Sequence, residues 1–178
     1  WEQRGTVGVT AAYAAAAALA VVRELGGDLT AAITTLTEQT PTPGRLRLVA
    51  GLKGSTIIDD TYNSSPVAAE QALQVLREVK HAKRKIVVLG DMLELGRYSN
   101  TAHTEVGKLV AGAATHLLTV GIRARGFATG ALAAGMDESV IWQYERADRA
   151  GRELQALLAP GDVVLVKGSQ SLRLERIV

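Results

Sequence analysis

Three short runs of branched apolar residues constrain most strongly what this chain can fold into. They are Ile86 to Leu89, Leu117 to Val120 and Val163 to Val166. Such runs are typical of strands that helices bury on both faces. Patterns that favour helices separate them, near residues 101–111, 123–133 and 147–158. The alternation predicts a doubly wound α/β fold with a mainly parallel sheet and flanking helices.

A hairpin and a helix are expected ahead of those runs. Residues Arg45 to Ala50 and Ser55 to Asp59 carry strand signals around a Gly51-to-Gly54 turn, which predicts a hairpin leading into the sheet. Ser65-Pro66 then supplies an N-cap and a proline for the first helical turn. Apolar residues recur at helical spacing from there to about residue 80, so we expect a helix over that span.

The segment before residue 40 is expected to hold two helices. Thr10 to Leu25 is apolar nearly all round, which predicts a buried, tightly packed helix that ends at Gly26-Gly27. It is too short and too rich in alanine to cross a bilayer, and no membrane span is expected. Asp28 is placed to cap a second helix, Leu29 to about Thr37.

A domain boundary is predicted at Pro41-Thr42-Pro43-Gly44, where two prolines and a glycine interrupt any regular element. We therefore divide the chain into residues 1–40, a linker at 41–44 and an α/β domain at 45–178. The chain begins at Trp1 and shows no signal-peptide pattern, so we expect it to be a piece of a longer protein.

Composition narrows the range of functions. The 178 residues contain no cysteine, which argues against disulfides and thiolate zinc sites and is compatible with the cytoplasm. The net charge is only +2, and the basic cluster Lys80 to Lys85 lacks the aromatic side chains that stack on bases. Nucleic-acid binding is therefore not expected.

Polar clusters follow three of the predicted strands: Asp59 to Asn63, Gly90 to Gly96, and Lys167 to Ser171. Parallel strands present their carboxyl ends at one edge of the sheet, so one common cleft is expected there. Taken singly, each polar residue could equally serve as a helix cap, a loop support or a solvated charge.

Several kinds of site are not expected. The sequence has no phosphate-binding G-x-x-x-x-G-K-[ST] loop, no dinucleotide fingerprint and no G-x-S-x-G elbow. His81, His103 and His116 have no partners at metal-ligand spacing, so no metal site is predicted in this chain.

The motifs taken together resemble the Mur ligases, and among them the type that adds D-alanyl-D-alanine to UDP-N-acetylmuramoyl-tripeptide. The resemblance runs from about Gly44 to the end of the chain. It rests on Gly44-Arg45, Asp59-Asp60-Thr61-Tyr62-Asn63-Ser64-Ser65-Pro66, Val88-Leu89-Gly90-Asp91-Met92-Leu93-Glu94-Leu95-Gly96, His103 with Gly107, Pro160-Gly161-Asp162 and Val166-Lys167-Gly168-Ser169.

The resemblance implies a cytoplasmic enzyme of peptidoglycan synthesis with three domains. Residues 45–178 would be the carboxy-terminal domain, preceded by the last helices of a central ATPase domain. The phosphate loop and the Mg²⁺ ligands would lie in that central domain, which would leave this chain inactive alone. In the implied reaction, ATP phosphorylates the terminal carboxylate of the tripeptide, and the amine of D-alanyl-D-alanine attacks the acyl phosphate.

The resemblance also implies roles for individual residues. Arg45 and Asn63 would act in catalysis, Arg45 by stabilising phosphate charge. The ATP-binding residues would be Arg45, Asp60, Tyr62 and Asn63, with Asp60 on the ribose. The residues for the incoming substrate would be Asp91, Glu94, Lys167, Ser169 and Ser171.

One departure from the family leaves alternatives open. Family members usually carry a His-Asn pair and a further asparagine ahead of the alanine-rich helix, and one asparagine contacts adenine. The matching positions here are Val7, Gly8 and Ala11. A non-catalytic relative with the same fold is therefore a second hypothesis. A receiver domain of bacterial signalling, with Asp91 as an exposed phosphoacceptor, is a third.

Overall fold

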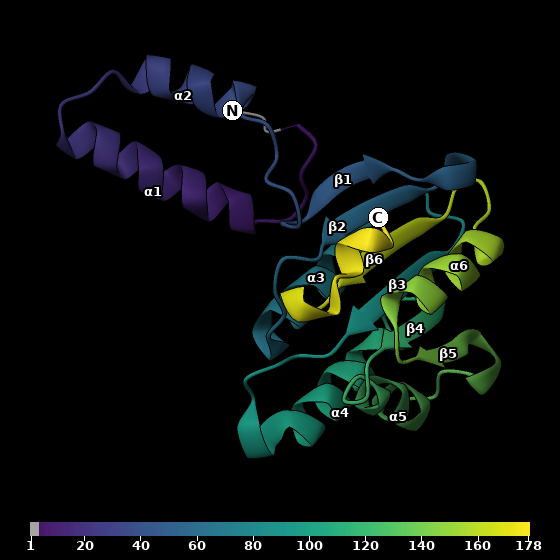
Figure 1. The fold of residues 1–178 in the computed structure, drawn as a ribbon. Helices are drawn as coiled ribbons and strands as arrows, with labels where there is room; N and C mark the ends of the chain where they lie inside the picture. The colour runs from purple at the N-terminus through teal and green to yellow at the C-terminus, as the bar shows by residue number, and fades with distance from the viewer. Residues whose placement is uncertain (1–3) are drawn as a thin grey trace.

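One sheet of six strands organises the computed structural model, which describes residues 4–178 (Figure 1). Its spatial order is β1-β2-β6-β3-β4-β5, with β1 antiparallel to β2 and the other neighbours parallel. The bounds are β1 Arg47–Ala50, β2 Thr56–Asp60, β3 Lys85–Gly90, β4 His116–Val120, β5 Ile141–Tyr144 and β6 Val163–Lys167. The predicted hairpin, the three buried strands and the α/β fold class are confirmed.

Helices cover both faces of this sheet. They are α3 (Pro66–Glu78), α4 (Ser99–Val110), α5 (Arg125–Ala133) and α6 (Ala147–Leu157). Short 3₁₀ turns lie in the connecting loops and after β6, at Leu52–Gly54, Gly96–Tyr98, Glu138–Val140, Gln170–Leu172 and Leu174–Arg176. Successive strand residues serve opposite faces, as the pleat requires. Ile58 belongs to the same buried cluster as Leu76 and Phe127, whereas Ile57 belongs to the cluster on the other side, with Leu154. Burial on both faces explains why the strands are apolar throughout.

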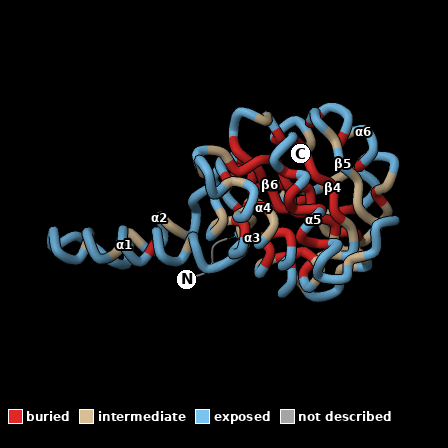
Figure 2. Tube along the Cα trace, turned by 90° about the horizontal axis from the view of Figure 1, so that it is seen from below, coloured by how far each residue is buried: buried red, intermediate tan, exposed pale blue. Residues whose placement is uncertain are grey.

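The first two helices form an arm that projects away from the sheet, α1 (Thr10–Glu24) and α2 (Leu29–Glu38) (Figure 1). Asp28 caps α2, as predicted, by accepting hydrogen bonds from the backbone N–H groups of Thr30 and Ala31. The prediction that the first helix is buried is wrong. Only Ala15 of α1 is buried, and the arm is exposed along most of its length (Figure 2). Within the described residues α1 packs mainly on α2, so most of its apolar circumference has no covering element.

The chain that enters the arm is attached to the edge of β1. Thr6 forms an antiparallel bridge with Arg47. The N–H of Val7 donates to the carbonyl of Leu46 at 3.1 Å, and the N–H of Leu48 donates to that of Gly5 at 2.8 Å. These bonds tie the base of the arm to the sheet.

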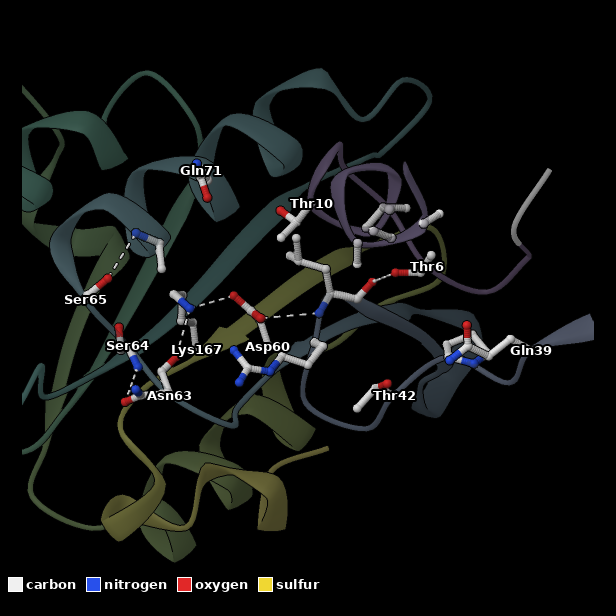
Figure 3. A pocket seen from close by; sticks show the side chains of 18 of the residues that line it. Thr6, Thr10, Gln39, Thr42, Asp60, Asn63, Ser64, Ser65, Gln71 and Lys167 are labelled. Atoms are coloured by element: carbon white, nitrogen blue, oxygen red, sulfur yellow. Dashed lines mark hydrogen bonds and ion pairs between the residues drawn. The ribbon is translucent and has the colours of Figure 1, made fainter. Parts of the chain in front are cut away.

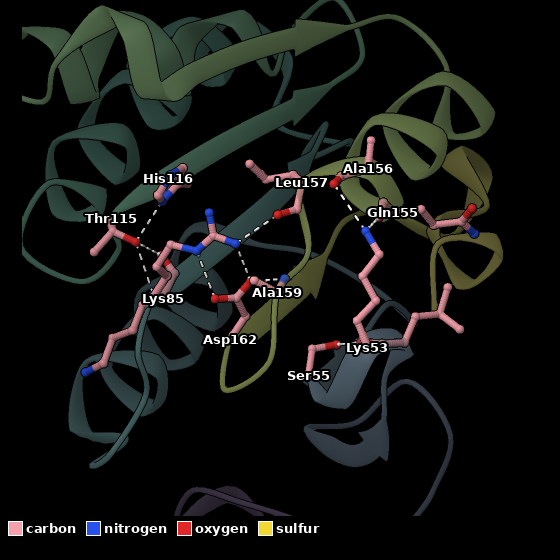
Figure 4. Close-up of polar contacts among 12 residues, drawn as sticks. Lys53, Ser55, Lys85, Thr115, His116, Gln155, Ala156, Leu157, Ala159 and Asp162 are labelled. Atoms are coloured by element: carbon pink, nitrogen blue, oxygen red, sulfur yellow. Dashed lines mark hydrogen bonds and ion pairs between the residues drawn. The ribbon is translucent and has the colours of Figure 1, made fainter.

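The amino ends of the strands are joined by a separate polar cluster (Figure 4). Arg84 donates to both carboxylate oxygens of Asp162, at 2.9 and 2.6 Å, and to the carbonyl of Leu157 at 2.8 Å. Asp162 is 1% exposed. Burial would raise the pKa of Asp162, but the hydrogen bonds from Arg84 and the backbone hold it below its usual value. This cluster stabilises the edge opposite the polar loops.

Two further features complete the fold. β5 was not predicted, because Ile141–Tyr144 is a short edge strand that is only half buried and lacks a strong apolar run. No helix within residues 4–178 combines the length and apolar character needed to cross a membrane.

Candidate functional site at the carboxyl ends of the strands

The polar loops predicted to share one edge of the sheet begin where β2, β6 and β3 end, and these three strands are adjacent. Their last residues are also in register. Asp60 of β2 lies opposite Lys167 of β6, which in turn lies opposite Leu89 of β3. The fold therefore brings the acidic pair and the lysine together from distant parts of the sequence.

Lys167 and Asp60 form a buried ion pair at this edge (Figure 3). The Nζ of Lys167 lies 2.6 Å from Oδ2 of Asp60 and donates a second hydrogen bond, 2.9 Å long, to the carbonyl of Asn63. Lys167 is only 2% exposed. A charge this deeply buried requires such compensation. The ammonium of Lys167 is therefore neutralised within the protein.

Asp59 points to the opposite side of β2 and holds the linker. Its Oδ2 accepts hydrogen bonds from the N–H of Gly44 at 2.9 Å and from Arg47 at 3.2 Å. Its Oδ1 accepts from the hydroxyl of Thr61 at 2.7 Å. No separate role was predicted for Asp59. The alternation of side chains along a strand could have revealed this role, because Asp59 and its neighbour Asp60 must face opposite sides of the sheet.

Asp60 holds the segment just after the linker from its own side of the strand. Its Oδ1 accepts a hydrogen bond from the N–H of Leu46 at 3.3 Å. Gly44 has φ of +71°, and a Cβ there would come within 2.9 Å of the backbone nitrogen of Tyr62. That nitrogen donates to the carbonyl of Gly44 at 3.2 Å. The linker is thus fixed to the end of β2 by backbone contacts that favour glycine.

Arg45 projects from this fixed segment and remains exposed. Its guanidinium carbon lies 4.2 Å from the centroid of the Tyr62 ring, a cation–π contact. Among the described residues, Arg45 makes no ion pair, in contrast to Arg47 and Lys167. It is therefore the cation at this edge that is best placed to bind an anion.

A cleft of about 650 Å³ lies between the arm and the sheet (Figure 3). Four of the predicted site residues line it: Arg45, Asp60, Asn63 and Lys167. Its wall on the arm is made of small side chains from α1: Ala11, Ala14, Ala15 and Ala18. The cleft therefore joins an apolar wall to a charged rim, an arrangement typical of small-molecule sites.

A second cleft, of about 740 Å³, lies on the other side of the linker. Tyr62 and Ser171 are the predicted site residues that line it, together with Arg47, Asp59 and Arg173. Ser171 is exposed, whereas Lys167 of the same motif is buried. The linker and the end of β2 thus separate two hollows.

The remaining predicted residues lie in neither cleft. Asp91 is buried, and its Oδ1 accepts a hydrogen bond from the N–H of Ala124 at 2.7 Å, next to the start of α5. The hydroxyl of Ser169 accepts from the N–H of Leu93 at 3.1 Å. Glu94 follows Leu93 in the loop after β3, where it is exposed and has φ of +63°. Their predicted contact with the incoming substrate stays a prediction.

Asp91 does not have the exposure that a phosphoacceptor needs. It is 6% exposed, and one carboxylate oxygen is already bound to the backbone of Ala124. The receiver hypothesis required an open aspartate at this position. Among residues 4–178 there is also no group of three or more side chains arranged to hold a metal ion.

Comparison with known proteins gives a consistent result. Residues 44–170 match the family described as Mur ligase, glutamate ligase domain. The UDP-N-acetylmuramoyl-tripeptide–D-alanyl-D-alanine ligase of Bacillus subtilis is 35% identical over 75% of this chain and 29% of its own length. The enzyme of the same name from Escherichia coli is 32% identical over 92% of this chain and 35% of its own length. The chain spans about a third of these relatives.

Solved structures agree with the sequence relatives. MurF from Acinetobacter baumannii superposes with a TM-score of 0.79 and 28% identity, covering 92% of this chain and 35% of that one. MurF ligase from Thermotoga maritima, solved in complex with ADP, superposes with a TM-score of 0.70 and 28% identity over 89% of this chain and 34% of its own.

Proposed function

The chain belongs to the Mur ligase family, and from this premise we propose that it is the carboxy-terminal part of an ATP-dependent ligase. The ligase joins D-alanyl-D-alanine to UDP-N-acetylmuramoyl-tripeptide in the cytoplasm. The names of the curated relatives support this substrate assignment. The observation that carries it is the convergence of Arg45, Asp60, Asn63 and Lys167 on one cleft at the carboxyl ends of β2 and β6.

Residues 1–40 are the last helices of the central ATPase domain, residues 41–44 are the hinge, and residues 45–178 are the carboxy-terminal domain. The exposure of α1 supports this division, since an apolar helix of this kind requires a covering partner. The phosphate loop and the Mg²⁺ ligands belong to the central domain. The chain alone therefore binds its ligands weakly and does not turn over.

The cleft fits a nucleotide in size and in chemistry. Its volume of about 650 Å³ is within the range of small-molecule sites. The alanine wall of α1 offers an apolar surface for a base, and Asp60 lies at the opposite rim. Asp60 already accepts two hydrogen bonds, but a carboxylate has lone pairs for about four. It can therefore still accept hydroxyl groups of a ribose.

Arg45 and Asn63 bind phosphate oxygens. Arg45 is exposed, faces the cleft and has no carboxylate partner among the described residues, so its charge is available. The Oδ1 of Asn63 accepts from the N–H of Ser64 at 2.8 Å, which orients the amide and leaves its NH₂ group to donate. Tyr62 supports Arg45 through the cation–π contact. Charge stabilisation of this kind is the main way proteins accelerate phosphoryl transfer.

ATP supplies the phosphoryl group that activates the terminal carboxylate of the tripeptide. The amine of D-alanyl-D-alanine then attacks the acyl carbon, the new C–N bond forms, phosphate leaves and the amine loses a proton. Glu94 and Ser171 bind the incoming dipeptide. Asp91, Ser169 and Lys167 hold the loops that surround it, as their buried hydrogen bonds support.

The test is phosphate release by the full-length ligase that contains this chain. We expect release only when ATP, the UDP-linked tripeptide and D-alanyl-D-alanine are all present. Omitting the dipeptide is the control, because hydrolysis that ignores the dipeptide belongs to another activity. A folded full-length protein that releases no phosphate with all three substrates would contradict the proposal.

The non-catalytic relative remains the second candidate, and one observation favours it. Ala11 lines the cleft at a position where the family places an asparagine, and Val7 lines it at the position of the family's histidine, so the base meets an apolar wall. A non-catalytic relative would bind nucleotide without dipeptide-dependent release of phosphate, and the same assay separates the two.

A further inference from the structure

His103 is a fully buried histidine that the proposed reaction does not use. It lies in α4, is 0% exposed and packs against Phe127 with ring centroids 4.8 Å apart. Its Nε2 lies 2.9 Å from the backbone nitrogen of Met92, and its Nδ1 lies 2.6 Å from the carbonyl oxygen of Ser99. Both ring nitrogens are therefore engaged with backbone groups.

These two partners determine the protonation of the ring. A backbone N–H can only donate, so Nε2 must accept from Met92 and carries no proton. A carbonyl can only accept, so Nδ1 must carry the proton that binds Ser99. Burial lowers the pKa of His103, and the positive charge of Arg123 acts in the same direction, while the Ser99 carbonyl and Asp91 oppose it. His103 is thus a neutral ring with a defined tautomer.

The bond to Met92 is one of a series that fixes the loop after β3. The carbonyl of Asp91 accepts from the N–H of Ser169 at 3.1 Å. The next N–H, of Met92, is bound by His103, and the one after it, of Leu93, is bound by the hydroxyl of Ser169. Three consecutive residues are therefore held before the chain reaches Glu94. Glu94 has φ of +63° and is exposed.

The packing of α4 on α5 explains how a histidine reaches this position. Gly126 of α5 faces His103 so closely that a Cβ there would lie 2.7 Å from the Cβ of His103. At Gly107 of α4, a Cβ would lie 2.3 Å from the carbonyl oxygen of Phe127. The glycines let the helices approach, and the ring of His103 fills the space beneath the loop.

We propose that His103 is a positioning residue that fixes residues 91–93 so that the carboxylate of Glu94 is presented to the amine of the incoming substrate. The identity of the incoming substrate rests on the proposed ligase function. The contacts of His103 with Met92 and Ser99 do not depend on that function. A carboxylate is suited to bind an ammonium group before attack, and its usefulness depends on where the loop holds it.

A matched pair of variants separates the two bonds of His103. His103→Gln places an amide oxygen near the position of Nε2 and can still accept from Met92. His103→Asn is shorter, keeps a donor near Nδ1 for Ser99 and leaves the N–H of Met92 without an acceptor. Without this buried hydrogen bond the loop no longer holds Glu94 in place, so we expect the Asn variant of the full-length ligase to raise KM for D-alanyl-D-alanine about tenfold. Its KM for ATP should stay within about twofold, and the Gln variant should recover most of the loss.

The unmodified chain provides a measurement that needs no variant. Nitrogen-15 NMR of its histidines should show His103 as the Nδ1–H tautomer, with slow hydrogen exchange at the Met92 amide. An Nε2–H tautomer, equal rises in both KM values, or a Gln variant no better than Asn would overturn the proposal. If the wild-type ligase releases no phosphate, the role of Glu94 is overturned together with the proposed function. The tautomer of His103 would still show whether its ring accepts the hydrogen bond from Met92.

Discussion

The ammonium of Lys167 lies 2.6 Å from a carboxylate oxygen of Asp60 and joins the carboxyl ends of β6 and β2. Asp60 also accepts a hydrogen bond from the backbone N–H of Leu46, so the same pair connects the sheet to the segment that follows the linker. Lys167 and Asp60 are both buried, with 2% and 8% of their surface exposed, so each charge depends mainly on the other for compensation. The ion pair therefore both stabilises the fold and shapes the cleft.

Lys167→Met should destabilise the chain by about 3–5 kcal/mol, because it leaves the charge of Asp60 buried without its partner. Urea denaturation at neutral pH measures this loss. The double variant Asp60→Asn/Lys167→Met is the control. It removes both charges and keeps an acceptor for Leu46, so it should recover most of the stability. A double variant as unstable as the single one would show that packing, not charge, causes the loss.

Asp60→Asn should raise KM for ATP in the full-length ligase by about tenfold, since a neutral amide is a weaker acceptor for ribose hydroxyls than a carboxylate. The asparagine is a better test than alanine, because alanine would also remove the acceptor for Leu46. The thermal midpoint of each variant serves as the control for folding. An unchanged ATP dependence would remove Asp60 from the nucleotide site.

The α/β fold could be predicted because it depends on local patterns. Buried strands, the Ser65-Pro66 helix start and the Asp28 cap each have a sequence signature, and each is confirmed. β5 could not be predicted, because its residues are stabilised by pairing with β4 at the sheet edge and not by an apolar run. The exposure of α1 could not be predicted either, since a pattern shows which face is apolar but not what covers it.

The site was predicted less completely than the fold. The motif residues lie near one edge, as expected, but they divide into two clefts and a set of buried loop contacts. The pairing of Lys167 with Asp60 joins residues 107 positions apart, and register between such strands is a property of the folded sheet. A residue-by-residue reading cannot distinguish a lysine that binds substrate from one that is neutralised by its neighbour.

Gly130→Ala should destabilise the protein, although alanine normally favours a helix over glycine by about 0.5–1 kcal/mol. A Cβ at Gly130 would lie 2.0 Å from the carbonyl oxygen of Thr104, so α4 and α5 would have to separate. We expect a loss of about 1–3 kcal/mol in chemical denaturation. Gly112→Ala is the control, because the nearest atom there is 3.9 Å away. A gain in stability at Gly130 would contradict the close packing.

Asp162→Asn should reduce stability by about 1–3 kcal/mol at pH 7 and by less in acid. The pKa of Asp162 is below its usual value of 3.8 in the folded chain. Its contribution is therefore complete above that value and is lost as pH falls through the folded pKa. Urea midpoints of both proteins at neutral pH and well below pH 3.8 should converge in acid. A difference that stays constant with pH would show that the charge on Asp162 is not responsible.

The most direct test of the nucleotide site is the turnover number of Arg45→Met in the full-length ligase. Arg97→Met is the matched control, because Arg97 also lies over a tyrosine ring, at 5.0 Å from Tyr98, but does not line either cleft. Loss of one donor to transferring phosphate should lower kcat about 100-fold for Arg45→Met and leave Arg97→Met within about twofold of wild type. Equal kcat values for wild type and a folded Arg45→Met would contradict the assignment of this cleft to phosphate.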